Sequence, residues 1–330
     1  MEYRFLGRTG VRVSELCFGT MSFGGDADHE TSRAMFDRCR EAGVNFFDCA
    51  NVYQRGVAEE ILGEFIQDCR EEVVITSKVY FPMGDDVNAR GATRYHIMQQ
   101  AEASLRRLNV DVIDVYFIHR FDDATPLDET LRALDDLVSQ GKILYPAASN
   151  FAAWQIEKAL GISIKEGWAP FEVLQPMYNL VKRQAEVEIL PMARAEQLGV
   201  IPYSPLGGGL LTGKYGLEKR PDDGRLTENK MYQTRYGAEW NYRTAEAFTQ
   251  FAREHGFHPV SLAVAWVGSH PAVTAPIIGA RNVEQLQDSL AAVEIDVTEE
   301  LRAEIGELSP EPPPATDRVE ERTPFQYGKR

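Results

Sequence analysis

The stretch Val112-Ile113-Asp114-Val115-Tyr116-Phe117-Ile118-His119 is a short apolar run that ends at a polar side chain. Seven other apolar runs have the same form, and each ends in a polar residue or a glycine. The eight ends lie at Gly19-Thr20, Asp48, Thr76-Ser77-Lys78, His119, Ser149-Asn150, Gln175, Ser204 and Gly279. Most ends are about 30 residues apart, the length of one βα unit. This layout predicts an α/β fold of the (β/α)8 (TIM) barrel type, whose site gathers at the carboxyl ends of the strands.

Stretches with helical periodicity lie between these ends. They predict helices over 30–41, 58–69, 94–107, 127–139, 154–164 and 184–197. Gly43, Gly141 and Gly199 follow three of them, at the position where a left-handed residue commonly ends a helix. Before the repeat begins, residues 3–6 and 11–13 flank Gly7-Arg8-Thr9-Gly10, which predicts a β-hairpin within residues 1–14.

The interval before the last strand end is much longer than the others. Its surplus predicts a loop over 206–240, rich in Gly, Lys, Arg and Asp, ahead of helices near 242–255 and 259–268. After a further helix at 299–308, the proline-rich start of the tail 309–330 predicts a stiff spacer. The tail either covers the barrel mouth or frays, and covering the mouth is the favoured interpretation. Since barrels of this length occur as one unit, residues 1–330 are expected to form a single domain.

Composition bounds the class of partner and the compartment. The net charge of −15 disfavours nucleic acid and anionic membranes, since both attract basic patches. The four cysteines are scattered without a CxxC pair, which favours a reducing, cytoplasmic location. The sequence shows no signal peptide and no apolar stretch of about 18 residues that would cross a membrane. Neither the oligomeric state nor the substrate is evident from the sequence.

Four residues at or just after the ends of the second, third and fourth strands predict proton chemistry: Asp48, Tyr53, Lys78 and His119. A tyrosine with a pKa near ~10 is a weak acid, and a neighbouring ammonium lowers that pKa. A carboxylate keeps the lysine charged, and a histidine can hydrogen-bond a carbonyl oxygen. Any one of these residues alone is more often a helix cap or a solvated charge. The combination predicts a proton donor that works without a metal.

Several segments resemble the aldo-keto reductase superfamily. Phe46-Phe47-Asp48-Cys49-Ala50-Asn51-Val52-Tyr53 is similar to its "FDTAxxY" motif, and Glu59-Glu60-Ile61-Leu62-Gly63 to its "SEExLG" motif. Further similar segments surround Lys78, His119, Ser149-Asn150, Gln175 and Tyr203-Ser204, and include 278–281. The resemblance runs from about Tyr3 to Ala292. The Gly207–Lys214 stretch looks like the subgroup of bacterial reductases and potassium-channel β-subunits.

The resemblance implies an NADPH-dependent oxidoreductase that reduces aldehydes or ketones of small molecules to alcohols. It makes Tyr53 the general acid, Lys78 and Asp48 its supports, and His119 the group that orients the carbonyl. It implies that the 206–240 loop folds over the cofactor. The residues it assigns to NADPH are Ser149, Asn150, Gln175, Tyr203, Ser204, Leu206, Gly207, Gly209, Gly279, Arg281, Gln285 and Asp288. Arg281 favours NADPH over NADH, because a guanidinium pairs well with a phosphate.

The sequence departs from the family pattern at a few positions. Cys49 replaces a usual Thr, Gln54 a common Gly, and Ser289 a frequent Asn, while 146–148 replaces Ile-Gly-Ala. Aromatic residues near the strand ends either line a substrate pocket or pack ordinarily: Phe23, Tyr80, Phe81, Phe121 and Tyr145.

Other site types fit the sequence poorly. Gly208–Lys214 fits a P-loop pattern, but Tyr215 stands where Ser or Thr is needed. His255 and His258 lack further ligands for a metal, so no metal site is expected. Two rival functions remain open. One is an NADPH-binding regulatory or redox-sensing barrel with slow turnover, and the other is a phosphate-binding barrel enzyme in which Lys78 forms a Schiff base.

Overall fold

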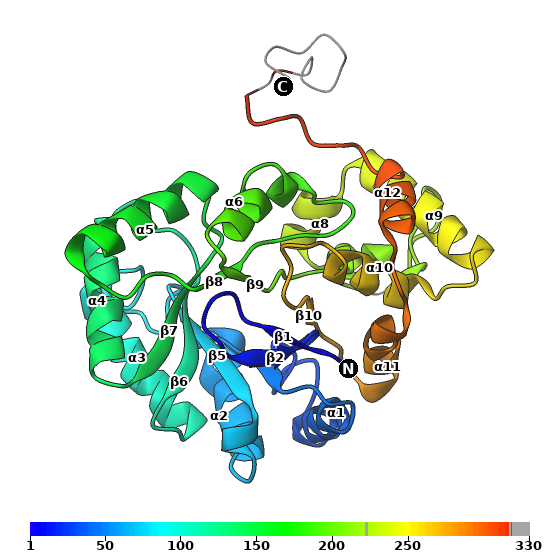
Figure 1. Cartoon of the computed structure of the whole chain (residues 1–330). Helices are drawn as coiled ribbons and strands as arrows, with labels where there is room; N and C mark the ends of the chain where they lie inside the picture. Colours follow the sequence, from blue (N-terminus) through cyan, green and yellow to red (C-terminus); the bar gives the residue numbers. More distant parts are fainter. Residues whose placement is uncertain (222–223, 317, 319–330) are drawn as a thin grey trace.

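Eight parallel strands form the centre of the molecule in the computed structural model, which describes residues 1–221, 224–316 and 318 (Figure 1). They are hydrogen-bonded in the order β10-β3-β4-β5-β6-β7-β8-β9. The bounds are β3 Cys17–Gly19, β4 Phe46–Asp48, β5 Val74–Val79, β6 Ile113–Ile118, β7 Ile143–Ser149, β8 Val173–Gln175, β9 Gly199–Val200 and β10 Ile277–Ile278. The ring is closed between its two ends, since the backbone N–H of Ile277 donates to Pro202 O (2.9 Å) and that of Thr274 to Val200 O (2.8 Å). The predicted barrel is confirmed.

Helices surround the strands and connect each one to the next (Figure 1). The α-helices are α1 His29–Glu41, α2 Val57–Phe65, α3 Arg94–Leu108, α4 Leu127–Ser139, α5 Ala153–Glu166, α6 Ile189–Ala195, α7 Arg225–Glu228, α8 Lys230–Tyr236, α9 Glu239–Glu254, α10 Pro259–Gly268, α11 Val283–Leu290 and α12 Glu299–Glu307. The 3-10 segments are η1 Tyr53–Gly56, η2 Arg70–Glu72, η3 Gln184–Glu186, η4 Gly207–Thr212 and η5 Ala291–Glu294. None of the described helices combines the length and apolarity that a membrane span needs.

The structure corrects three of the expected boundaries. Helix α2 ends at Phe65, four residues earlier than predicted. The stretch 184–197 is divided into η3 and α6, and Gln197 (φ 56°), not Gly199, takes the left-handed position there. Gly199 instead belongs to β9, where an added Cβ would lie 2.8 Å from Leu6.

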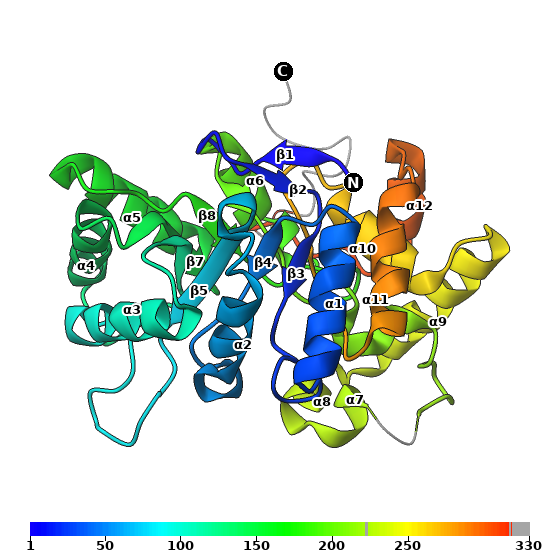
Figure 2. The ribbon, with the colours of Figure 1, turned by 90° about the horizontal axis from the view of Figure 1, so that it is seen from below.

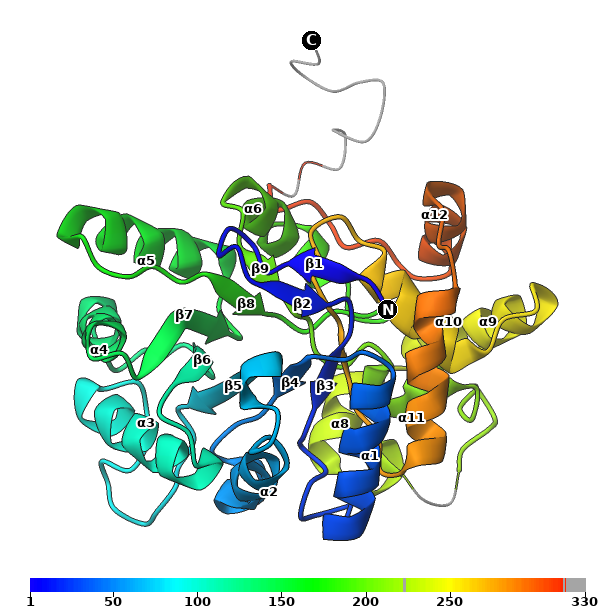
Figure 3. The ribbon, with the colours of Figure 1, turned by 60° about the horizontal axis from the view of Figure 1, so that its bottom comes forward.

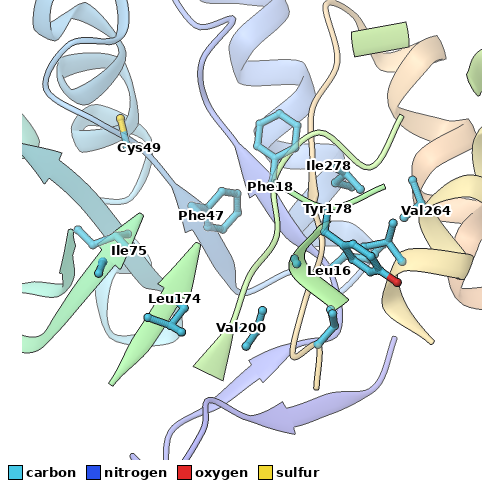
Figure 4. Packing of buried hydrophobic residues seen from close by; sticks show 14 of the residues in the cluster. Leu16, Phe18, Phe47, Cys49, Ile75, Leu174, Tyr178, Val200, Val264 and Ile278 are labelled. Atoms are coloured by element: carbon cyan, nitrogen blue, oxygen red, sulfur yellow. The ribbon is translucent and has the colours of Figure 1, made fainter. Parts of the chain in front are cut away.

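Side chains that alternate along the strands build two cores. Those pointing inward form an inner cluster that includes Phe46, Val115 and Phe117. Those pointing outward, such as Phe47 and Ile75, pack between the strands and the helices (Figure 4). The FFD stretch therefore places Phe46 and Asp48 inside the barrel and Phe47 outside, as a strand period of two requires.

The predicted N-terminal hairpin is confirmed, with β1 (Tyr3–Phe5) antiparallel to β2 (Arg12–Ser14). It lies across the amino-terminal end of the barrel, at the opposite end from α7 and α8 (Figures 2 and 3). Leu6 and Val13 are fully buried and join the inner cluster. The hairpin thus closes one end of the barrel and leaves the carboxyl end as the place for a site.

The segment 206–240 is more ordered than the predicted loop. It contains η4, α7 and α8, and α9 already begins at Glu239. Residues 222–223 of this segment lie outside the described residues. The expected cover of the barrel mouth by 309–330 falls largely outside them too, since only 309–316 and 318 are described. Residues 310–314 form neither helix nor strand and lead away from α12 at the rim of the molecule (Figure 1).

Candidate active site

The strand β5 brings an ammonium group into the barrel interior. Thr76 and Lys78 face inward, whereas Ser77 faces the helices and hydrogen-bonds the buried Glu59. Lys78 is fully buried, and its Nζ lies 2.7 Å from both carboxylate oxygens of Asp48. It also donates to Cys49 O (2.7 Å) and, at 3.4 Å, to the hydroxyl of Tyr53. Burial opposes the charge of Lys78, but Asp48, Tyr53 and Cys49 together outweigh it and raise the lysine pKa.

Tyr53 begins the strained turn η1, which follows β4 after residues 49–52. Its successors Gln54 (φ 47°) and Arg55 (φ 55°) have left-handed backbones that non-glycine residues rarely adopt, and Gly56 follows at φ 101°. Arg107 lies so close to Gly56 that an added Cβ would come within 2.6 Å of its Cδ. This turn aims the phenol at Lys78. Lys78 lowers the pKa of Tyr53, as expected, but burial raises it more, and the phenol holds its proton.

His119 follows β6 and stands beside the phenol. Its ring contacts the rings of Tyr53 and Phe81 edge-on, with distances between ring centroids of 6.1 Å and 5.0 Å. Burial and the charge of Lys78 hold the pKa of His119 well below its usual value. No hydrogen-bond partner among the described residues reaches the buried Nδ1. The imidazole is therefore neutral, and its Nε2 is the nitrogen that remains for a ligand.

The residues predicted to hold the nicotinamide form one hydrogen-bonded network with these groups. Ser149 Oγ donates to Gln175 O (2.9 Å), and Asn150 Nδ2 donates to Ser149 Oγ and His119 O. Asn150 Oδ1 accepts from the hydroxyl of Tyr203 (2.7 Å). Gln175 Nε2 donates to Asp48 Oδ1 (2.8 Å). The structure thus brings these four residues and the four predicted catalytic residues together.

A run of left-handed backbone follows β9. Ser204 has φ 60°, and Gly207, Gly208 and Gly209 have φ of 59°, 68° and 98°. Leu206 precedes the glycines and caps η4, and a Cβ on Gly209 would meet nothing nearer than 3.7 Å. Consecutive glycines of this kind let a ligand approach the backbone closely.

The remaining predicted cofactor residues gather separately, at the start of α11. Gly279 and Arg281 follow β10, and the Arg281 N–H donates to Gln285 Oε1 (3.2 Å). The guanidinium of Arg281 pairs with Asp26 at 3.0 Å. Asp288 lies further along α11, and its Oδ1 is 3.9 Å from Nδ1 of His258. The loop that carries Asp26 is held to this segment by Ser22, whose hydroxyl donates to Ala280 O (2.7 Å).

Three residues of the site were missed from the sequence. Thr76 donates to Asp48 Oδ1 (2.8 Å), and its spacing of two from Lys78 was the available signal. Asn179, which is fully buried, donates to Ser204 O (2.8 Å) and so supports the turn before the glycines. Asp26 lies in a loop with no pattern that points to Arg281.

The structure also places the residues that depart from the family pattern and the aromatic residues near the strand ends. Cys49 is buried, and its pKa rises to about 12 because of burial. Ser289 is buried in α11. Of the aromatic residues, Phe23 packs in the outer core and Tyr145 against the inner cluster, so they do not line the mouth. Tyr80 and Phe81 contact each other (5.3 Å) beside His119, and Phe121 contacts the exposed Trp154 (6.1 Å).

Comparisons with known proteins agree with this arrangement. The model of the Aldo/keto reductase family matches residues 15–310. The uncharacterized oxidoreductase YrpG of Bacillus subtilis (strain 168) is 40% identical over 326 residues, covering 94% of this chain and 97% of that protein. A probable voltage-gated potassium channel subunit beta of Oryza sativa subsp. japonica is 37% identical and covers 89% and 92%. Norsolorinic acid reductase of Aspergillus flavus is 32% identical and covers 91% and 79%.

Proposed function

The chain belongs to the aldo/keto reductase family and is an oxidoreductase, and from this we propose that it reduces aldehyde or ketone groups of small molecules with NADPH. The observation that carries the proposal is the buried contact of Lys78 Nζ with both Asp48 and the Tyr53 hydroxyl. It joins a protonated phenol, a fixed ammonium and a neutral imidazole at one end of a barrel. The four unpaired cysteines further support a cytoplasmic location.

The residues present fit a nicotinamide dinucleotide. Ser149, Asn150 and Gln175 offer amide and hydroxyl groups for the carboxamide, beside the Tyr203 ring. The turn at Ser204 and Leu206 and the glycines 207–209 would hold the pyrophosphate, with the 206–240 segment over it. Gly279, Arg281, Gln285 and Asp288 would hold the adenosine 2′-phosphate end. When bound, the reduced nicotinamide supplies the hydride.

The protein's own part in the reaction is to position and protonate the carbonyl. His119 Nε2 and the Tyr53 hydroxyl converge on the carbonyl oxygen, and His119 donates a hydrogen bond that orients it. Tyr53 gives its proton to this oxygen as negative charge develops there. Lys78 stabilises the phenolate that remains, because its positive charge stands next to the phenol in a buried site. Asp48 keeps Lys78 charged and placed.

The geometry disfavours a Schiff base on Lys78. A Schiff-base lysine must become neutral and reach a carbonyl carbon. Lys78 is fully buried, its pKa is raised, and its three protons have acceptors in Asp48, Cys49 O and Tyr53. A regulatory role with slow turnover is the second candidate, since one relative is named as a probable potassium channel subunit beta.

The test is NADPH consumption against a panel of aldehydes, ketones and keto-sugars, with Tyr53→Phe as control. The proposal expects turnover by the wild type and a loss of about 10²–10⁴-fold in kcat for the variant. Equal consumption by both proteins contradicts the mechanism. A single burst followed by little turnover favours the regulatory role, and trapping of a substrate on Lys78 by borohydride favours the Schiff base.

A further inference from the structure

A hydrogen bond crosses the inside of the barrel between Gln175 and Asp48. Gln175 ends β8 and Asp48 ends β4, and three strands separate them around the ring. Gln175 Nε2 nevertheless lies 2.8 Å from Asp48 Oδ1, and both residues are almost fully buried. The residue predicted to contact the nicotinamide therefore also contacts the partner of the catalytic lysine.

Asp48 Oδ1 accepts hydrogen bonds from three side chains: Lys78 Nζ, Thr76 Oγ1 and Gln175 Nε2. Thr76 comes from β5 on one side, and Gln175 reaches in from the opposite wall. Two donors from different directions fix the rotation of the carboxylate plane. That plane in turn fixes Nζ, whose remaining protons point to Cys49 O and to the Tyr53 hydroxyl.

We propose that Gln175 is a positioning residue that orients Asp48, and through it Lys78, toward the Tyr53 hydroxyl. This inference rests on the proposed function, because it concerns the same proton donor. Gln175 also belongs to the network that joins Ser149, Asn150 and Tyr203, through its backbone oxygen. Gln175 thereby links the nicotinamide pocket to the acidity of the phenol.

The sign of the effect follows from the charges that face Asp48 and Tyr53. These titratable groups are Lys78 on β5, Cys49 after β4, Cys17 on β3, His119 after β6, and Glu59 on α2 behind Cys49. Lys78 is the cation nearest to the phenol, and Asp48 is the anion that disfavours the phenolate. Loss of the Gln175 donor removes a dipole that offsets the negative charge of Asp48, and it loosens Lys78. Both changes raise the pH at which Tyr53 loses its proton.

The experiment compares variants that separate the two contacts of Gln175. Gln175→Met keeps the length of the side chain and removes its hydrogen-bonding groups. Thr76→Val removes the other neutral side-chain donor to Asp48. Ser149→Ala alters the nicotinamide pocket without removing a contact of Asp48. For each, the NADPH Kd is measured by fluorescence titration, and kcat for alcohol oxidation is measured against pH.

Oxidation requires the phenolate, so its rate rises with pH through the Tyr53 pKa. Gln175→Met and Thr76→Val should both shift this rise upward by about half a pH unit or more, the effect of one lost hydrogen bond. Ser149→Ala should leave the rise in place while weakening NADPH binding. Thr76→Val should leave the NADPH Kd unchanged.

A Gln175→Met protein that binds NADPH more weakly but keeps the wild-type pH dependence overturns the inference. Should that variant not fold, Gln175→Leu also removes the donor to Asp48 and must shift the rise in the same direction. An unshifted Gln175→Leu profile overturns the inference as well. If the wild type neither binds NADPH nor oxidises any alcohol, the proposed function itself fails.

Discussion

The ammonium of Lys78 lies 3.4 Å from the hydroxyl of Tyr53, within a pocket that exposes none of the lysine to solvent. Burial keeps the phenol protonated, because it makes the phenolate unfavourable. In the proposed reaction the phenolate that forms when the proton is given up would pair with the ammonium in a site of low dielectric.

Replacement of Lys78 by Met should destabilise the protein, because it leaves the Asp48 carboxylate buried and without its cation. Removal of one partner of a buried ion pair costs about 3–5 kcal/mol. The double variant Asp48→Asn, Lys78→Met should recover a large part of that loss. Urea unfolding of the three proteins without nucleotide measures these differences. A Lys78→Met protein as stable as the wild type would show that the pair is not buried as described.

The neutral state of His119 should make stability fall in acid. Its pKa in the folded protein lies well below the value of about 6.5 in the unfolded chain, so unfolding takes up a proton below pH ~6.5. Below pH ~6.5 the free energy of unfolding therefore decreases as the pH is lowered, by up to about 1.4 kcal/mol per pH unit. His119→Asn should remove this component from the pH profile of urea unfolding. His255→Asn, at an exposed position, is the control.

Replacement of Arg281 by Met should weaken the binding of NADPH more than the binding of NADH, because only NADPH carries the 2′-phosphate. A charge-assisted hydrogen bond of about 1.5–3 kcal/mol corresponds to a rise in the NADPH Kd of roughly tenfold to hundredfold. Arg33→Met, on the exposed face of α1, controls for the loss of one surface charge. Fluorescence titration with both nucleotides measures the ratio. Equal weakening of NADH and NADPH binding would show that Arg281 does not contact the 2′-phosphate.

Two neighbouring glycines should respond differently to alanine. A Cβ on Gly208 would come within 2.6 Å of the Tyr232 ring, whereas one on Gly209 meets only Lys214 Cε at 3.7 Å and Tyr215 at 4.0 Å. Both substitutions carry the left-handed penalty of about 1–2 kcal/mol. Gly208→Ala should be the less stable protein in thermal unfolding, because it must also displace α8. Equal melting temperatures would show that the Tyr232 ring can move aside without loss of stability.

The barrel, its hairpin and the positions of the four proposed catalytic residues could be predicted because they depend on local pattern. Asp48, Lys78 and His119 each end an apolar run, and parallel strands bring such ends together. The contacts of Gln175 with Asp48 and of Arg281 with Asp26 join residues far apart in the chain, and no periodicity specifies them. The helices α7 and α8 within 206–240 were missed because they have only 4 and 7 residues, too few to show a helical period.

The hairpin covers the amino-terminal end of the barrel, where Leu6 and Val13 are buried in the inner cluster. In the proposed reaction, substrate, product and protons would therefore all use the carboxyl end. The Tyr53 phenolate would then take up its next proton from the side by which the alcohol leaves, and reprotonation would follow product departure.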